Sequence, residues 1–133
     1  KYPENLRVCF DTCHVSDSGL DLTEGFDTVI DKFDQALGKD QIAVFHINDS
    51  KNSVGAGKDR HENLGFGTIG FETLNYIVHH KDFENVPKIL ETPYIKTEDG
   101  KKSYPPYKYE IEMLRTETFV PQMKEKILED NAK

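Results

Sequence analysis

Gln-Ile-Ala-Val-Phe-His-Ile-Asn, residues 41–48, is a nearly unbroken apolar run with a histidine close to its end. Two other runs have the same character: Leu-Arg-Val-Cys-Phe-Asp at residues 6–11 and Pro-Lys-Ile-Leu-Glu-Thr at residues 87–92. Short runs of this kind are typical of strands buried on both faces of a parallel sheet. The sequence therefore predicts strands at 6–11, 41–48 and 87–92.

Helical patterns lie between and after these runs. Residues 25–37 carry apolar side chains at spacings of three and four, which predicts an amphipathic helix that Gly38 ends. Further helices are predicted at residues 71–80, 111–119 and 121–128, with a polar loop at 93–108 and a frayed tail at 129–133. Because strands and helices alternate, we expect an α/β fold with right-handed parallel crossovers.

The length of the chain limits what this sheet can become. The chain has 133 residues, which suggests one domain. Three strands cannot close a (β/α)8 barrel, which needs eight strands in about 250 residues. We therefore expect either a small open sheet or the last part of a larger barrel.

Charge and composition exclude some classes of protein and leave others open. The formal net charge of -7 argues mildly against a nucleic-acid partner, but bound dications would offset several acidic ligands. No run of about 18 apolar residues occurs, and residues 1–5 are polar, so we expect a cytoplasmic protein with no membrane partner. Cys9 and Cys13 are expected to be reduced; a disulfide between them, or Cys13 as a metal ligand, is the alternative.

Each predicted strand ends in a side chain that can bind a metal ion. Asp11 closes the first run, His46 lies near the end of the second, and Glu91 lies near the end of the third. Carboxylate and imidazole groups are ligands for zinc and similar ions, and strand ends are where α/β folds expose such groups. Taken alone, Asp11 also fits a residue that caps the next loop. Three such strand ends together favour a metal site.

A second set of candidate ligands lies outside the strands. Asp59-x-His61 places a carboxylate and an imidazole on the same side of an extended backbone. His14, three residues after Asp11, is a plausible third member. The alternative for Asp59 and His61 is a solvated loop, because residues 58–62 are a mixed charge run, and His14 alone also fits a surface histidine.

Residues 65–70, Gly-Phe-Gly-Thr-Ile-Gly, match the dinucleotide-binding pattern G-x-G-x-x-G. That pattern must directly follow a strand, whereas a long polar loop precedes it here. We expect a tight turn leading into the helix at Phe71, with close approach to a phosphate as the alternative. His79 and His80, at the end of that helix, are expected on the surface.

Taken together, four segments resemble the endonuclease IV family of apurinic/apyrimidinic endonucleases. They are Phe-Asp-Thr-Cys-His (10–14), His-Ile-Asn-Asp-Ser-Lys (46–51), Lys-Asp-Arg-His-Glu-Asn-Leu-Gly-Phe-Gly-Thr-Ile-Gly (58–70) and Ile-Leu-Glu-Thr-Pro (89–93). The resemblance runs from about Leu6 to Leu114. It implies a TIM barrel whose three zinc ions serve to cleave double-stranded DNA on the 5′ side of an abasic site in base excision repair.

The resemblance also implies roles for particular residues. One of the paired zinc ions would be held by Asp11, His46 and Glu91, which would form the catalytic centre. The third zinc ion would be held by His14, Asp59 and His61. Manganese is an alternative metal. Arg60 and Lys51 are candidate DNA-phosphate contacts, with solvated loop charges as the alternative.

The chain matches only the last three βα units of the family. The earlier units supply two histidines and a bridging glutamate, so we expect one complete and one partial zinc site, and little activity from this chain alone. Its expected partners are the missing N-terminal units, or a second copy through the exposed barrel edge. The rival interpretations are a fragment of a metal-dependent sugar isomerase or epimerase, and a non-catalytic metal-binding fragment.

Overall fold

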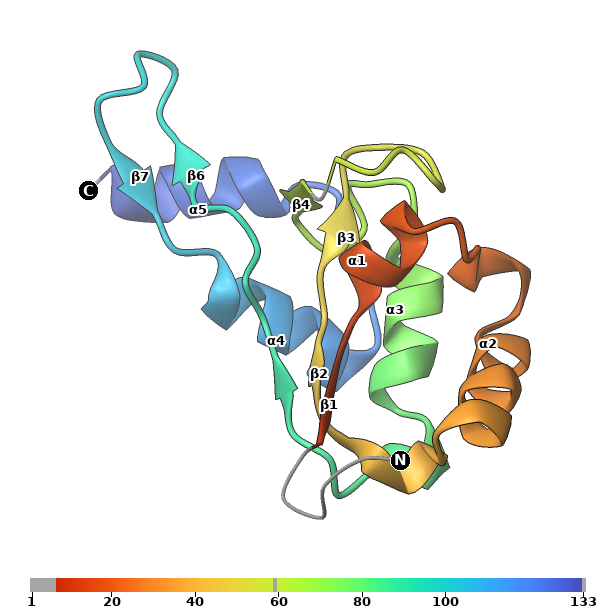
Figure 1. Cartoon of the computed structure of the whole chain (residues 1–133). Coiled ribbons are helices and arrows are strands. Elements are labelled where there is room, and N and C mark those ends of the chain that lie inside the picture. Colours follow the sequence, from red (N-terminus) through yellow and green to blue (C-terminus); the bar gives the residue numbers. More distant parts are fainter. Residues whose placement is uncertain (1–6, 59, 133) are drawn as a thin grey trace.

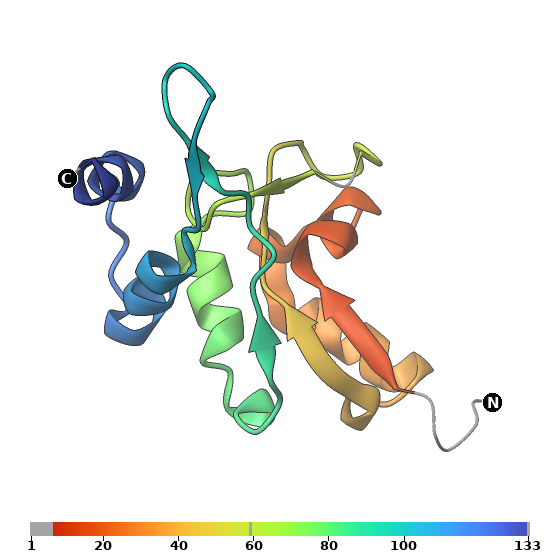
Figure 2. The ribbon, with the colours of Figure 1, turned by 90° about the vertical axis from the view of Figure 1, so that its left-hand side faces the viewer.

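A three-stranded parallel sheet organises the fold. The computed structural model describes residues 7–58 and 60–132. In it, strands β1 (Val8–Asp11), β2 (Ile42–His46) and β5 (Lys88–Ile89) lie in the order β1-β2-β5, and both pairings are parallel (Figures 1 and 2). The predicted α/β class and parallel sheet are confirmed. Within the described residues the sheet is open, because β1 and β5 each pair only with β2.

The second and third strands are shorter than the predicted 41–48 and 87–92. The backbone ladder between them ends at the bond from the Ile47 N–H to the Ile89 carbonyl. Beyond that point the Glu91 N–H donates to the side chain of Asn48 instead of to a backbone carbonyl. A side chain therefore replaces the strand pairing that the apolar pattern had suggested.

The four predicted helices are present in the predicted order, and three short helical elements were not predicted: a helix directly after β1 and two 3-10 helices. The helical elements are α1 (Thr12–Asp17), α2 (Leu22–Ala36), η1 (Lys39–Gln41), α3 (Phe71–Val78), η2 (Lys81–Phe83), α4 (Tyr107–Thr116) and α5 (Met123–Asn131). Short antiparallel pairs are formed by β3 (Asp49–Ser50) with β4 (His61–Glu62), and by β6 (Ile95–Lys96) with β7 (Ser103–Tyr104).

Several boundaries differ from the predictions for local reasons. Helix α2 starts at Leu22 because Asp21 caps it, accepting the Thr23 N–H at 3.0 Å, and Gly25 then forms a kink inside the helix. The tail expected to fray from residue 129 is helical to Asn131, whose side-chain amide donates to the Ile127 carbonyl at 2.8 Å. The predicted polar loop 93–108 contains the β6–β7 pair and the start of α4.

Aromatic packing joins one face of the sheet to helix α2 and to the 3-10 helix η2. Phe45 is fully buried; its ring centroid lies 5.3 Å from that of Phe10 and 4.9 Å from that of Phe83. Phe26 of α2 lies 6.0 Å from Phe10 in an edge-to-face arrangement. Burying rings of this size is a main source of stability in a small domain. This layer fixes the strands relative to one another and thus fixes the positions of their ends.

The opposite face of the sheet is more exposed. Cys9 and Ile89 are exposed there, with Ile89 45% accessible, and Val44 is half-buried. The strand register shifts between Val8 and Cys9, so that Cys9 stands opposite Val44. Among the described residues, no helix is both long and apolar enough to cross a membrane.

Of the two neighbouring histidines after α3, both expected on the surface, His79 is exposed and His80 is not. His79 is exposed, and its Nε2 lies 2.8 Å from the Leu114 carbonyl oxygen. The side chain of His80 is only 11% exposed, and its Nε2 lies 3.0 Å from a carboxylate oxygen of Asp27. The Tyr76 hydroxyl donates to the same carboxylate, so His80 helps to join α3 to α2.

Candidate metal centre

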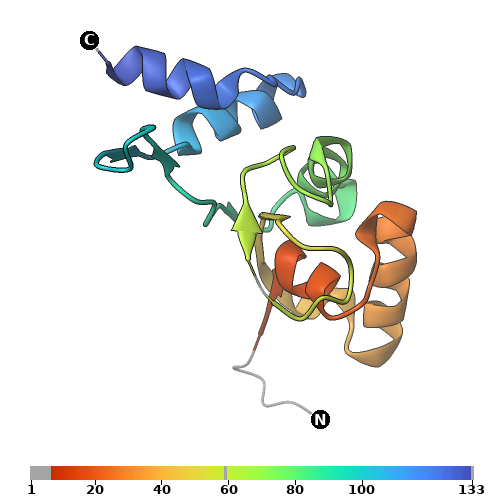
Figure 3. The ribbon, with the colours of Figure 1, turned by 90° about the horizontal axis from the view of Figure 1, so that it is seen from above.

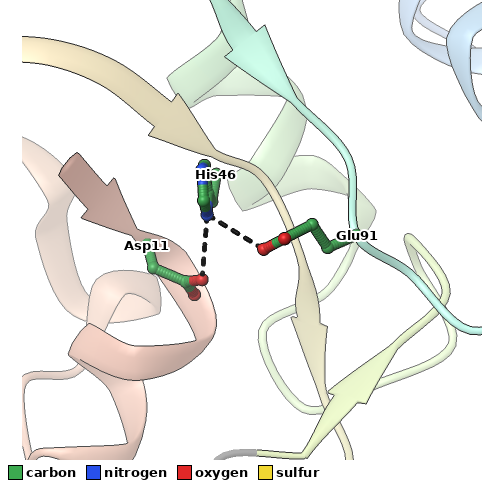
Figure 4. A group of neighbouring side chains, drawn as sticks. All are labelled: Asp11, His46 and Glu91. Carbon is green, nitrogen blue, oxygen red and sulfur yellow. Dashed lines mark ion pairs between the residues drawn. The ribbon is translucent and has the colours of Figure 1, made fainter.

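The three strand ends bring a carboxylate, an imidazole and a second carboxylate together. His46 Nδ1 lies 2.9 Å from Glu91 Oε1 and 3.6 Å from Asp11 Oδ2 (Figure 4). One potential ligand atom from each residue lies within 4.8 Å of the other two. The strand register explains why these three side chains meet. Asp11 and Ile89 are the two strand partners of His46, and Glu91 comes two residues after Ile89.

The chemistry of these donors fits a divalent metal ion. Two carboxylates approach one imidazole nitrogen, and the side chains of Asp11, His46 and Glu91 are 12%, 25% and 52% exposed. Mixed oxygen and nitrogen ligands of this kind suit zinc or manganese. Two acidic groups so close together repel each other unless a cation lies between them. The arrangement is therefore one that could hold a divalent cation at the carboxyl end of the sheet.

Asp11 uses its two oxygens differently. Oδ1 accepts the His14 N–H at 3.0 Å and so caps helix α1, while Oδ2 faces His46. The capping interpretation and the ligand interpretation of Asp11 are thus compatible. His14 itself lies exposed within α1.

His61 lies beside the same three residues. Its Nε2 is 3.8 Å from Asp11 Oδ2, and its Nδ1 is 3.0 Å from the Glu91 carbonyl oxygen. Because a carbonyl oxygen only accepts, a hydrogen bond at this position requires a proton on Nδ1, and Nε2 faces Asp11. Metal-binding histidines are commonly oriented through such a second hydrogen bond. The predicted group of His14, Asp59 and His61 includes Asp59, which lies outside the described residues.

The two predicted DNA contacts are neighbours across the β3–β4 pair. The Lys51 N–H donates to the Arg60 carbonyl at 3.0 Å, and both residues are exposed. Figure 3 looks down on the carboxyl ends of the strands and shows β4 close to α1 at this end of the molecule. Arg60 directly precedes His61 in the sequence. Lys51 lies across the strand pair, where it follows Ser50, the residue opposite His61.

The glycine-rich segment 65–70 surrounds a buried carboxylate that sequence reasoning missed. Asp49 is fully buried, and it accepts backbone N–H groups from Ser50, Gly65, Gly67, Ile69 and Gly70. Burial raises the pKa of Asp49, and the backbone hydrogen bonds oppose that rise. These donors already bond to the Asp49 carboxyl group, which leaves them unavailable to a phosphate. The predicted tight turn into α3 is confirmed.

A second buried carboxylate, Glu110 of α4, was also missed. It is 0% exposed and accepts from Asn63 Nδ2 and the Leu64 N–H, both at 3.1 Å, and from the Thr92 hydroxyl. Thr92 directly follows Glu91, and Asn63 comes two residues after His61. Burial raises the pKa of Glu110. A glutamate inside an amphipathic helix gives no sequence signal of such a position, whereas the polar run after the second strand could have pointed to Asp49.

Comparison with known proteins identifies the family. The model of the xylose isomerase-like TIM barrel family matches residues 2–117. A protein called probable endonuclease 4 from Lachnoclostridium phytofermentans is 65% identical over 128 residues, covering 96% of this chain and 43% of the relative. One of the same description from Staphylococcus carnosus is 61% identical, with the same coverage. The chain thus spans less than half the length of these relatives.

A solved structure gives the same result for the fold. The crystal structure of endonuclease IV from Thermus thermophilus superposes with a TM-score of 0.69 and 32% identity, over 84% of this chain and 38% of that one. The relatives carry the endonuclease 4 description, and the motifs at 10–14, 46–51, 58–70 and 89–93 predict the same group. The chain belongs to the xylose isomerase-like TIM barrel family and, within it, to the endonuclease IV family.

Proposed function

We propose that this chain is the C-terminal part, the last three βα units, of a zinc-dependent endonuclease that cleaves DNA on the 5′ side of abasic sites. The observation that carries the proposal is the convergence of Asp11, His46 and Glu91 within 4.8 Å at the open end of the sheet. The relatives described as probable endonuclease 4 support the same activity. Zinc bound at this centre supplies a Lewis acid that stabilises charge developing on a phosphodiester.

The chain's own residues hold and orient the reacting groups. Asp11 and Glu91 supply two carboxylate oxygens and His46 supplies Nδ1, from three different strand ends. Glu91, 52% exposed, has the most accessible carboxylate of the three and is placed to meet a substrate. His61, presented by β4, adds an imidazole nitrogen 3.8 Å from Asp11. We assign His14, Asp59 and His61 to the third zinc ion.

Arg60 and Lys51 are proposed to contact DNA phosphates. Both are exposed on the strand pair that carries His61. Phosphate contacts position a nucleic acid without reading its sequence. That role suits an enzyme whose substrate is defined by a missing base.

The direct test uses a complete protein. We expect a chimera in which this chain replaces the matching segment of the Lachnoclostridium phytofermentans relative to nick duplex DNA 5′ of an abasic site. Glu91→Gln should lower this rate by about a hundredfold or more, as expected for lost transition-state stabilisation. Glu112→Gln, exposed on α4, is the matched control and should retain the rate. Conversion of an aldose to a ketose without any nick would favour the isomerase interpretation instead.

Comparing the incision rate of this chain alone with that of the chimera tests whether the chain is an inactive part of a larger enzyme. The 133-residue chain alone should incise abasic DNA at least about a hundredfold more slowly than the chimera, because it supplies only part of the electrostatic stabilisation. Equal rates would contradict the fragment interpretation. A zinc titration of the chain alone checks the ligand sets: His61→Ala should remove the tighter phase, and loss of that phase in Glu91→Ala instead would overturn the assignment.

The exposed face and unpaired edges of the open sheet support a proposal about which partner this chain binds. Ile89 is 45% exposed on the face away from the helices, and β1 and β5 are sheet edges within the described residues. Unpaired edges favour pairing with another chain. We propose that this face binds the remaining barrel units, or a second copy when they are absent. Light scattering should show association of the chain alone, and a stable monomer that gains nothing on mixing would contradict this.

A further inference from the structure

One fully buried side chain, Asn48, lies between the candidate ligands and has no assigned role. It is 0% exposed and comes two residues after His46. We propose that Asn48 is a positioning residue that holds Asp11 and Glu91 at the spacing a metal ion needs. This inference rests on the proposed function, because it concerns the same centre.

The side-chain amide of Asn48 bonds to both neighbouring strand ends. Its Oδ1 accepts the Glu91 N–H at 2.9 Å. Its Nδ2 lies 3.5 Å from Asp11 Oδ2, the oxygen that faces His46. A single short side chain that both donates and accepts is required for this, and an amide meets the requirement. Asn48 therefore touches the backbone of one candidate ligand and the carboxylate of the other.

The backbone of Asn48 is itself fixed, so the amide has little freedom to turn away. The Thr12 hydroxyl donates to the Asn48 carbonyl at 2.7 Å and accepts the Asn48 N–H at 2.9 Å. Thr12 is also fully buried, and it directly follows Asp11. The end of β1 and the end of β2 are thus joined by two bonds between a hydroxyl and a backbone.

The position of Asn48 also explains why the sheet opens at this level. The last backbone bond between the second and third strands runs from Ile47 to Ile89. At the next step the amide of Asn48 takes the place of a carbonyl and meets the Glu91 N–H. After Ile89 the third strand therefore separates from the second, and the length of the Asn48 side chain sets the distance between their backbones. Glu91 then lies close to His46.

The substitution Asn48→Asp tests the proposal with almost no change in shape. The acceptor for the Glu91 N–H remains, but the donor to Asp11 becomes an acidic oxygen. In the chimera, we expect zinc affinity, measured by competition with a chelating dye, to fall by about tenfold to a hundredfold, as for other residues that orient metal ligands. The kcat for incision should fall by a similar factor, while KM for abasic DNA changes by less than about threefold.

A second pair of variants tests the same idea without changing the Asn48 side chain or any candidate ligand side chain, although the Thr12 hydroxyl also lies 3.3 Å from the His46 carbonyl oxygen. Thr12→Val keeps the shape but loses both bonds to Asn48, and it should weaken zinc binding; Thr12→Ser keeps the hydroxyl and should restore it. Asn75→Asp, on α3 and bonded to Glu117, is the control for an amide-to-acid change elsewhere.

The outcomes distinguish this proposal from the function on which it rests. If Asn48→Asp folds and retains zinc affinity within twofold, or if its effect is on KM alone, Asn48 is not a positioning residue. If Asn48→Asp does not fold, the Thr12 pair decides, and equal zinc affinity in Val and Ser variants contradicts the proposal. If the wild-type chimera binds zinc but never nicks abasic DNA, the function fails while the affinity measurements still test Asn48.

Discussion

Two regions of this molecule place carboxylates in opposite environments. Asp49 and Glu110 are 0% exposed, and the partners of their oxygens are N–H and hydroxyl donors. Asp11 and Glu91 are partly exposed and approach the same imidazole nitrogen. An ionised group in the interior needs its hydrogen-bonding capacity filled. The oxygens of Asp49 and Glu110 are therefore occupied by hydrogen bonds within the fold. Asp11 and Glu91 each have an oxygen that faces His46 and is available to a cation. Burial and the type of partner, and not the residue type, separate the two uses.

The largest effect should come from removing the imidazole shared by the exposed pair. His46→Ala should lower zinc affinity at this centre by more than about a hundredfold, because residues that only orient ligands already cost tenfold to a hundredfold. Isothermal titration of zinc into the chimera checks this. His79→Ala, whose ring contacts the Leu114 carbonyl, should leave the affinity unchanged. An equal loss of zinc affinity in His46→Ala and His79→Ala would show that partial exposure and shared contacts do not distinguish metal ligands from structural residues.

The next effect should appear in stability and not in metal binding. Asp49→Ala leaves the N–H groups around it without an acceptor, and each orphaned buried donor costs about 1–3 kcal/mol. We expect the free energy of unfolding, measured by urea denaturation, to fall by at least about 3 kcal/mol. Asp31→Ala, exposed on α2, should be close to neutral. A stable Asp49→Ala protein would mean that water replaces the carboxylate inside the loop.

Two glycines of the same loop provide a finer comparison. A Cβ at Gly67 would collide with the Ser50 carbonyl oxygen and the Asp49 carboxylate, whereas a Cβ at Gly70 would meet no atom within 4 Å. Gly67→Ala should therefore cost about 3 kcal/mol or more, because the added Cβ overpacks against a backbone carbonyl. Gly70→Ala, at φ of 90° and ψ of 155°, should cost about 1–3 kcal/mol through backbone strain alone, because this region is adopted almost only by glycine. Thermal unfolding of both variants should rank them in this order, and the reverse ranking would contradict the packing around Asp49.

The smallest effect should be a change in pH dependence at Glu110. Burial raises its pKa above the ordinary 4.5, so the folded protein keeps the proton to higher pH than the unfolded chain does. The contribution to stability is full below pH 4.5 and declines as pH rises through the raised pKa. Glu110→Gln should match the wild type below pH 4.5 and be more stable above it, by about 1 kcal/mol.

The control for that experiment lies on the same helix. Glu112→Gln changes an exposed carboxylate and should show no comparable dependence on pH. Urea denaturation from pH 4 to pH 8 measures both variants. A Glu110→Gln protein that is less stable at pH 7 would mean that the ionised carboxylate contributes more through its three hydrogen bonds than its burial costs.

Much of the centre followed from the order of residues along the chain. Parallel strands in register bring their carboxyl ends to one level, so a ligand type at the end of each run is enough to predict that Asp11, His46 and Glu91 meet. Their role as zinc ligands stays a prediction. The fold class and parallel sheet followed from the same apolar runs, and the order of the predicted helices from their periodicity.

The parts that were not predicted depend on contacts between distant segments. Glu110 and Asn63 are 47 residues apart, and Asn48 and Glu91 are 43 apart. Local pattern carries no information on such pairs, and a polar residue after a strand is as typical of a solvated turn as of a buried bridge. The strand lengths were overestimated for the same reason, since a side chain of Asn48 ended the ladder within an apolar run.

The two oxygens of the Asp11 carboxylate have different partners, and this links the formation of helix α1 to the binding of a cation. One oxygen caps α1 through the His14 N–H, and the other faces His46 in the candidate cation site. Any cation that fixes the rotamer of Asp11 also fixes the acceptor at the start of α1, and by reciprocity a well-formed α1 favours cation binding. The amide hydrogen of His14 is therefore a local reporter. Its exchange with solvent should slow as the site fills, and a spectroscopist could follow occupancy from the backbone of a helix that never touches that ion.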